Sequence, residues 1–181
     1  MAARSRRTTA SAPVPEFVPA FAAQRHAAGS KELLMFELQR ARVAVNAALQ
    51  GVAGGASERP VRPGGWTLRE VVLHLAVRDS ARLEEFDAAL AGTPASWIRI
   101  EHDAMAEVNE AHLAPLRRLS FDEAVRLLHT TRAALLERLA AVPGEPARLW
   151  NAEHPFGAML AGLAPHDRKH AEQIKHARMQ G

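Results

Sequence analysis

Apolar residues recur every three to four positions along most of the chain that follows residue 30. This spacing keeps them on one face of an α-helix, and no stretch shows the apolar–polar alternation of a half-buried strand. The pattern predicts helical segments at residues 31–52, 67–90, 98–114, 121–142 and 157–180. It therefore predicts an all-α fold.

Polar residues mark the beginning of three of these segments. Ser30 precedes the first segment and is a predicted N-cap. Thr67 with Glu70, and Ser120 with Glu123, match the capping box, in which a hydroxyl and a carboxylate three residues apart bond each other's backbone N–H. The four long segments are joined by short connections. They predict an antiparallel four-helix bundle with a short extra helix.

Pro165 interrupts the last segment, because its ring nitrogen cannot donate a hydrogen bond to Ala161. The helix is therefore expected either to kink there or to begin afresh with Pro165 near its first position. This choice decides whether His166 and His170 point into the bundle.

Residues 1–29 are rich in Ala, Ser, Thr, Pro and Arg and show no sustained periodicity. This composition predicts a mobile N-terminal extension, which Phe17 and Phe21 could dock onto the remainder of the chain. Residues 30–181 are then one bundle domain, because neither an internal repeat nor a second domain is evident.

The charge of the chain argues against a nucleic-acid partner. The formal net charge is +3, and the four arginines and single glutamate of residues 1–30 account for all of it. A bundle without net charge lacks the basic footprint of a nucleic-acid-binding surface.

No apolar run approaches the length that spans a bilayer, and the prolines of residues 12–21 break any signal-peptide core. We expect a cytoplasmic protein with no membrane partner.

The 181-residue chain contains no cysteine. Thiolate metal sites and cysteine nucleophiles are therefore excluded, and any metal must be held by His, Asp or Glu. A small-molecule thiol could still act as a substrate.

Histidines near the C-terminus form a candidate site. His166 and His170 project within roughly 40° of each other on a helix, with Gln173 between them, so both could reach one ion. His176 points away and is predicted to be exposed. Asp167 adjoins a candidate ligand but projects about 100° from it, which favours a cap or a salt bridge. The pair alone is also compatible with two surface histidines.

A third ligand would have to come from another helix, and His74 is the best candidate. It lies within the apolar stretch "VVLHLAV" and is therefore expected to be buried. Two interpretations remain open at this point. His74 is either a metal ligand or a core histidine hydrogen-bonded to a carbonyl or carboxylate.

The order of these motifs resembles the DinB-like, or YfiT-like, superfamily. Its members share a tryptophan before the second helix, a histidine about eight residues later, and an H-x-x-x-H pair followed by Gln-Ile on the last helix. The matching residues are Trp66, His74, His166, His170, Gln173 and Ile174. The resemblance implies a four-helix bundle whose three histidines bind zinc or nickel, with Gln173 and Asp167 beside the ligands.

The same superfamily includes mycothiol-dependent maleylpyruvate isomerase and bacillithiol transferases. Asp103 and Asn109 are reminiscent of that branch, which implies a low-molecular-weight thiol as cosubstrate. Pro165, immediately before the first histidine of the pair, departs from the usual pattern.

Three neutral imidazoles leave a coordination position open on a divalent ion that keeps its full charge, as in catalytic zinc sites. The resemblance then favours thiol-dependent transfer or isomerisation of a small molecule, or its hydrolysis. The competing interpretation is a non-catalytic small-ligand-binding or stress-response bundle with a structural or absent metal. No residue is identified as a general base. A homodimer is also expected, because bundles with an exposed apolar edge often dimerise.

Overall fold

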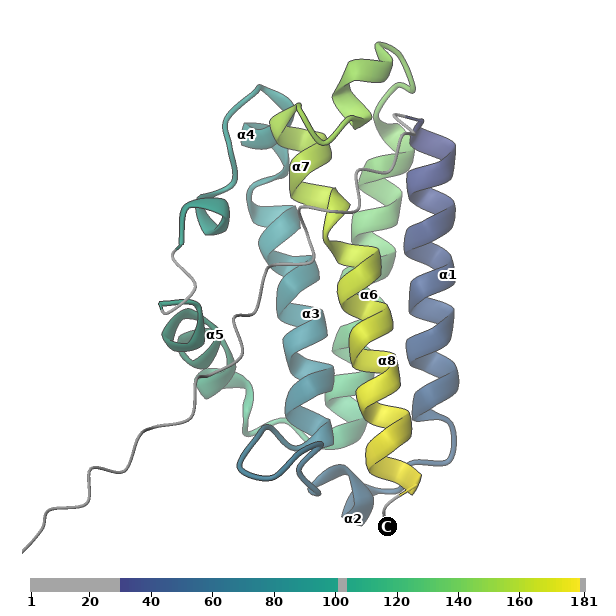
Figure 1. Cartoon of the computed structure of the whole chain (residues 1–181), viewed down its shortest axis with the longest axis vertical. Helices are drawn as coiled ribbons and strands as arrows, with labels where there is room; N and C mark the ends of the chain where they lie inside the picture. Colours follow the sequence, from purple (N-terminus) through teal and green to yellow (C-terminus); the bar gives the residue numbers. More distant parts are fainter. Residues whose placement is uncertain (1–29, 101–103, 180–181) are drawn as a thin grey trace, which may run out of the picture.

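Four long helices stand side by side in this computed structural model, which describes residues 30–100 and 104–179 (Figure 1). They are α1 (Lys31–Leu49), α3 (Leu68–Glu84), α6 (Phe121–Ala141) and α8 (Leu163–Met179). Within the described ranges the only β pairing is an isolated bridge between Pro60 and Thr67. The predicted all-α four-helix bundle is confirmed, whereas the N-terminal extension, with Phe17 and Phe21, lies outside the described residues.

The four helices form two pairs. Helix α1 packs along α8, and α3 packs along α6. Figure 1 shows that helices within a pair run parallel and that the two pairs run in opposite directions. The parallel order within a pair arises because the connection from α3 to α6 returns along the bundle before α6 begins. The expected antiparallel arrangement therefore holds between the pairs.

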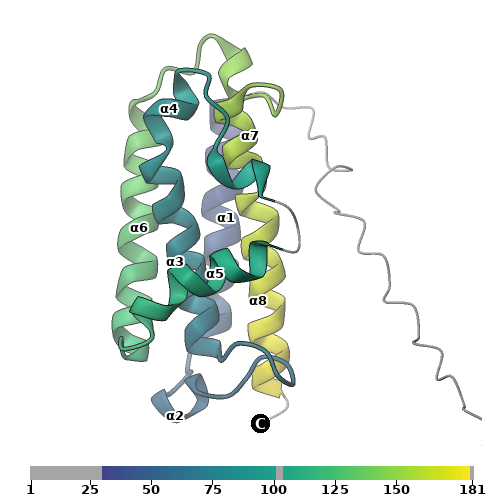
Figure 2. The same ribbon diagram turned by 90° about the vertical axis from the view of Figure 1, so that its left-hand side faces the viewer.

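Besides the last segment, which contains Pro165, two predicted segments are broken in the structure. Residues 67–90 divide at Glu85 into α3 and the short α4 (Phe86–Leu90). The prediction of one helix over residues 98–114 is wrong, because a 3₁₀ turn, Ser96–Arg99, precedes a separate α5, Met105–Leu113. Helix α5 crosses the outer side of α3 (Figure 2).

The shorter elements lie at the two ends of the bundle. They are α2 (Gly54–Ser57), α7 (Pro155–Ala161) and the 3₁₀ turns Ala114–Leu116 and Ala147–Trp150. None of the described helices combines the length and the apolar character needed to span a membrane.

The predicted helix caps are present. The Ser30 hydroxyl accepts a hydrogen bond from the backbone N–H of Leu33. Thr67 with Glu70, and Ser120 with Glu123, form complete capping boxes. A cap of this kind contributes about 1 kcal/mol to helix stability. These caps fix the starting points of three of the four long helices.

The last helix begins afresh near Pro165. Helix α7 ends at Ala161, and α8 begins at Leu163 after Gly162. Pro165 therefore lies in the first turn of α8, where a backbone N–H has no partner within the helix. The next residue, His166, donates its backbone N–H to the Gly162 carbonyl at 3.2 Å. The proline thus costs no hydrogen bond within α8.

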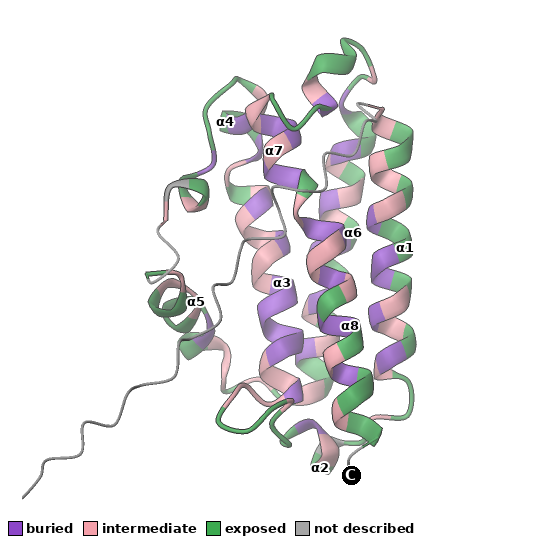
Figure 3. Ribbon diagram, in the orientation of Figure 1, coloured by how far each residue is buried: buried purple, intermediate pink, exposed green. Residues whose placement is uncertain are grey.

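The bundle has two apolar core clusters, one toward each end. Buried positions run along the inward side of every long helix (Figure 3). Between the positions of the two clusters, each of these helices contributes one residue to a group of buried, paired charges. These residues, the ion-pair cluster, are Arg42, Asp79, Arg132 and Asp167.

Every charge in the ion-pair cluster is compensated. Arg132 donates hydrogen bonds to the carboxylate of Asp79 from Nε and Nη2, at 3.0 and 2.8 Å. Arg42 bonds Asp167 through Nε at 3.1 Å and Asp79 through Nη2 at 3.0 Å. Arg132 Nη2 also lies 3.1 Å from the Asp167 carboxylate. Two cations and two anions therefore meet in the middle of the core with no net charge.

Candidate metal centre

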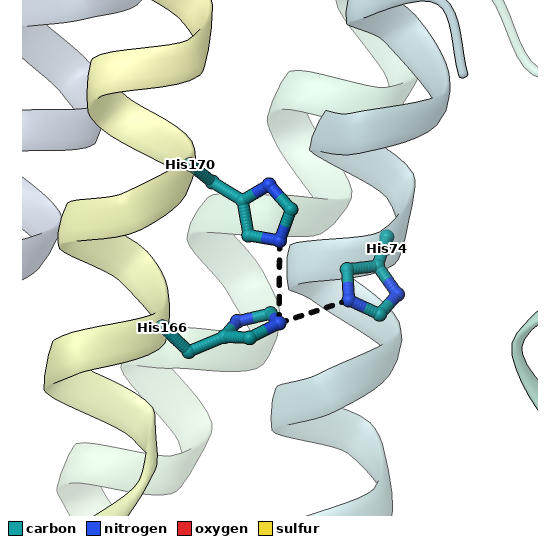
Figure 4. Close-up of side chains that lie close together, drawn as sticks. All are labelled: His74, His166 and His170. Carbon is teal, nitrogen blue, oxygen red and sulfur yellow. Dashed lines mark hydrogen bonds between the residues drawn. The ribbon is translucent and has the colours of Figure 1, made fainter. Parts of the chain in front are cut away.

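The three histidines singled out from the sequence meet between α3 and α8 (Figure 4). His74 comes from α3, and His166 and His170 lie one turn apart on α8. The Nε2 atom of His166 lies 3.0 Å from Nε2 of His74 and 3.2 Å from Nε2 of His170. We refer to these residues as the histidine triad.

The spacing of the triad fits a metal ion. At metal–nitrogen bonds of about 2.0–2.1 Å, tetrahedral nitrogen ligands lie about 3.3 Å apart. One ligand atom from each histidine lies within 4.8 Å of the other two. Hydrogen bonding explains the geometry less well, because Nε2 of His166 has one lone pair or one proton to share between two neighbours. A cation between the three nitrogens satisfies all of them.

Burial keeps the triad uncharged near neutral pH. Desolvation lowers the pKa of His74 and His166 well below the ordinary histidine value, and the nearby positive groups lower it further. The pKa of His170 falls to about 4, mainly through desolvation and next through Lys169. Neutral imidazole is the form that binds a metal ion. The three rings are therefore available as ligands without first losing a proton.

The second ring nitrogen of each histidine is buried without a hydrogen-bond partner among the described residues. Trp66 covers His74, with ring centroids 4.7 Å apart and the planes tilted by 44°. The Gln173 side chain acts on His170 and opposes the lowering of its pKa. The residue expected beside the triad on α8 thus interacts with it.

Asp167 has a different role from the one expected beside the ligands. Its carboxylate belongs to the ion-pair cluster, where it pairs with Arg42 and Arg132. This agrees with the salt bridge that its projection on the helix favoured. His176 is exposed, as expected from the same projection. Asn109 lies on α5 and is half-buried, whereas Asp103 is outside the described residues.

The buried Arg82 and the half-buried Arg78 lie near the triad, with Trp97 packed on both, and the sequence reasoning did not identify them. Arg78 and Arg82 follow His74 at intervals of four residues, so all three share one face of α3. The guanidinium carbons of Arg82 and Arg78 lie 4.1 and 5.1 Å from the centre of the Trp97 ring. The four-residue spacing from His74 is the signal that would have found the two arginines.

The surroundings of the triad are positively charged. Arg78 and Arg82 both act electrostatically on His74 and His166. Among the hydrogen bonds of the described residues, no carboxylate reaches a triad nitrogen. A site of this kind favours anionic groups, whether a thiolate or an acidic substrate. Among the described residues, no side chain bonds to the triad as a general base would.

Comparison with protein families gives one assignment. The sequence model of the DinB superfamily matches residues 22–174, which include the three histidines. A comparison with curated protein sequences finds no match.

Solved structures of similar fold include two with descriptive titles. One is "Sibling Lethal Factor Precursor - DfsB", at 16% identity and a TM-score of 0.68, covering 83% of this chain and 96% of that one. The other is the colibactin self-resistance protein ClbS in complex with a dsDNA, at 12% identity and a TM-score of 0.70, covering 84% and 97%. A protein from Escherichia coli UTI89 also matches, at 8% identity and a TM-score of 0.65, covering 84% and 94%.

At these identities the likeness establishes the fold alone. The ClbS complex with a dsDNA is at odds with treating this fold as one that excludes nucleic acid. The absence of a nucleic-acid partner therefore stays a prediction that rests on the charge of this chain.

Proposed function

We propose that this chain, which belongs to the DinB superfamily, is a divalent-metal-dependent enzyme acting on a small molecule. His74, His166 and His170 are the proposed ligands of zinc or nickel. The observation that carries the proposal is the convergence of one ring nitrogen from each of the three histidines, all within 4.8 Å of one another. Buried polar groups that lack protein partners commonly mark a functional site.

The chain's own residues supply binding and orientation. A bound divalent ion would supply Lewis acidity toward a thiol, water or carbonyl group. Packing of Trp66 on His74, and of the two α8 histidines one turn apart, fixes the directions of the imidazole rings. Arg78 and Arg82 add positive charge, which stabilises an anionic nucleophile near the triad.

Thiol-dependent transfer or isomerisation is the reaction class that we favour, with hydrolysis as the other. The chain has no cysteine, so a nucleophilic thiol must arrive as a low-molecular-weight cosubstrate. The positive surroundings of the triad support this choice, because they favour the thiolate over the thiol. The absence of a general base among the described contacts also suits a thiol, which ionises more readily than water.

A non-catalytic small-ligand-binding or stress-response role is the second candidate. The observation in its favour is that no described acid or base bonds to the triad beyond the histidines themselves. Under this alternative the metal is structural or absent, and the ligand is bound unchanged. The self-resistance role named for ClbS is one example of a protective function on this fold.

Cytoplasmic location and a homodimer remain predictions. Leu33, Phe36 and Val43 on α1 are exposed large apolar residues, which supports the expectation of a partner copy. Light scattering of the purified protein will give its oligomeric state.

Metal analysis tests the proposed site. Protein purified without a histidine tag is incubated with a zinc or nickel salt and then desalted. It is expected to hold about one metal ion per chain. The His74→Ala variant should lose most of that metal, whereas His129→Ala, which removes an exposed histidine from α6, should retain it. Equal metal content in wild type and His74→Ala would contradict the triad as the site.

Loss of free thiol tests the reaction. The metal-loaded protein is mixed with a small thiol and an electrophilic unsaturated acid, and thiol consumption is followed with time. Faster consumption than with His74→Ala supports transfer or isomerisation. A loaded protein that neither consumes thiol nor hydrolyses ester or amide substrates would favour the binding role.

A further inference from the structure

We propose that Arg82, Arg78 and Trp97 form a carboxylate-binding subsite beside the histidine triad. It follows that the substrate is a small carboxylic acid. The substrate assignment rests on the proposed function, whereas binding of the carboxylate does not require the metal.

The first observation is a group of buried donors without acceptors. Within the described residues, Nε of Arg78, Nε and Nη2 of Arg82, and Nε1 of Trp97 are buried and have no hydrogen-bond partner. All four atoms are donors only. The side chain of Arg82 is fully buried, at 0% exposure. A buried cation without a partner is costly, so this arrangement calls for an anion that accepts several hydrogen bonds.

The second observation comes from other arginines of the same chain. Arg132 holds Asp79 through Nε and Nη2 at 3.0 and 2.8 Å. Arg69 holds Glu58 through the same two atoms at 2.7 and 3.0 Å. These two nitrogens form one edge of the guanidinium and match the two oxygens of a carboxylate.

Among the described residues, the same edge of Arg82 has no hydrogen-bond partner. Its remaining nitrogen, Nη1, donates to the backbone carbonyl of Arg78 at 3.2 Å, which fixes the orientation of the group. Nε and Nη2 are therefore left as a pair with the geometry that binds carboxylates elsewhere in this molecule. The geometry points to a planar carboxylate as the ligand.

Neighbouring carboxylates are already engaged. Of the described acidic residues, Asp79 and Glu85 act electrostatically on Arg82. Asp79 is held by Arg42 and Arg132 in the ion-pair cluster. Glu85 accepts hydrogen bonds from the backbone N–H and hydroxyl of Ser96. Neither carboxylate bonds to the Nε–Nη2 edge of Arg82, so the ligand has to come from outside the described chain.

The position of the subsite makes the ligand a candidate substrate. His74, Arg78 and Arg82 lie at four-residue intervals on α3, about 6 Å apart along the helix axis. Long side chains on a helix lean toward its N-terminus, which on α3 is the direction of His74. A carboxylate on Arg82 would therefore place the remainder of a small acid toward the triad. Arg78 and Trp97 are partly exposed, so solvent reaches the edge of the subsite.

Thermal unfolding of the full chain tests the subsite. The protein is treated with EDTA and titrated with benzoate, with benzamide as the neutral analogue of the same shape. Benzoate near saturation should raise the unfolding temperature by about 5–10 °C, and benzamide should leave it unchanged. A response to inorganic phosphate or sulfate but not to benzoate would overturn the preference for a planar carboxylate.

Variants of Arg82 locate the effect. Arg82→Lys keeps the positive charge but loses the bidentate pair of N–H donors. Benzoate affinity should therefore fall about tenfold. Arg82→Met should abolish the benzoate response while folding at least as stably as wild type, because it removes an unpartnered buried charge. Arg118→Met, on an exposed arginine, should respond as wild type does. Failure of Arg82→Met to fold would show that Arg82 has a stabilising role and would overturn the proposal.

Metal binding and benzoate binding can be lost independently of each other. His74→Ala should lose metal and still bind benzoate. A wild type that binds no metal but responds to benzoate would refute the proposed function and keep the subsite. A wild type that binds metal and ignores benzoate would refute the subsite alone.

Discussion

Two neighbouring buried polar clusters share helices α3 and α8. The charges of the ion-pair cluster are paired with one another, whereas the polar groups at the histidine triad are not. On α8, His166 belongs to the triad and the next residue, Asp167, belongs to the ion-pair cluster. On α3, Arg78 lies beside the triad and the next residue, Asp79, is in the ion-pair cluster. Adjacent residues point about 100° apart on a helix, so each helix serves both clusters.

The ion-pair cluster is complete without any ligand. Two arginines face two aspartates, and the third nitrogens of the arginines donate to the carbonyls of Leu128 and Leu38 at 3.1 and 3.0 Å. All four long helices contribute one member each. Such a network links the helices at a fixed register, and removing any one member leaves a buried charge behind.

The triad and its arginines are incomplete without a ligand. Ring nitrogens, guanidinium nitrogens and the Trp97 indole nitrogen are buried without partners within the described residues. Proteins usually satisfy buried polar groups, and exceptions concentrate at functional sites. The ion-pair cluster is therefore internally paired, whereas the unpaired groups around the triad are those for which we propose a metal ion and a carboxylate as ligands.

The largest effect is expected from breaking the ion-pair cluster. Asp79→Ala leaves Arg42 and Arg132 without their shared carboxylate and should lower the free energy of unfolding by about 3–5 kcal/mol. Chemical denaturation measures this difference. Asp87→Ala removes an exposed partner of Arg138 and should cost no more than about 1 kcal/mol. Similar losses in the two variants would contradict the structural role of the cluster.

The pH dependence of the metal-free protein is the next largest effect. The pKa of His170 is about 4 in the folded protein and about 6.5 when unfolded, so the folded state binds fewer protons between these values. Stability is therefore present above about pH 6.5 and falls as the pH drops toward 4, by about 3 kcal/mol for this residue.

Denaturation curves at several pH values measure that slope. His170→Asn should reduce the slope and leave the contributions of His74 and His166, whereas His129→Asn, at an exposed site, should leave the slope as in wild type. A wild-type stability that does not change between pH 6.5 and 4 would mean that the triad is not buried in its neutral form.

The smallest effect is expected from replacing Trp97, whose ring packs against Arg78 and Arg82. Trp97 stacks on Arg82, and Trp97→Leu should lower stability by about 1 kcal/mol. In the Arg82→Met background the same change should cost less, because the cation has been removed. Denaturation of the two single variants and the double variant gives the coupling. Strictly additive losses would show that the tryptophan does not help to hold the buried cation.

The helical pattern and the caps could be predicted from the sequence because they depend on local chemistry. Thr67 with Glu70 sets the start of α3 by hydrogen bonds within four residues. The predicted helix over 98–114 was wrong because apolar spacing alone does not show where a chain leaves the helical conformation. The long return from α3 to α6, which makes these helices parallel, is likewise a property of tertiary packing.

The local spacing and the apolar stretch made the three histidines candidates but left other interpretations open, and the resemblance to the DinB-like superfamily joined them into one predicted site. The ion-pair cluster was not identified. Arg42 and Asp79 look like solvent-facing positions when each helix is considered alone, and their burial becomes favourable only when four helices bring opposite charges together. The orphaned donors of Arg82 also require the folded structure, since the sequence does not show which charges find partners.

Anomalous diffraction from crystals of zinc-soaked protein tests the central claim most directly. We predict one strong peak at the zinc edge, about 2.0–2.1 Å from the Nε2 atoms of His74, His166 and His170. A peak at that position that vanishes in His74→Ala crystals would establish the triad as the metal site. Zinc found only at other residues, or no zinc at the triad in a fully soaked crystal, would contradict it.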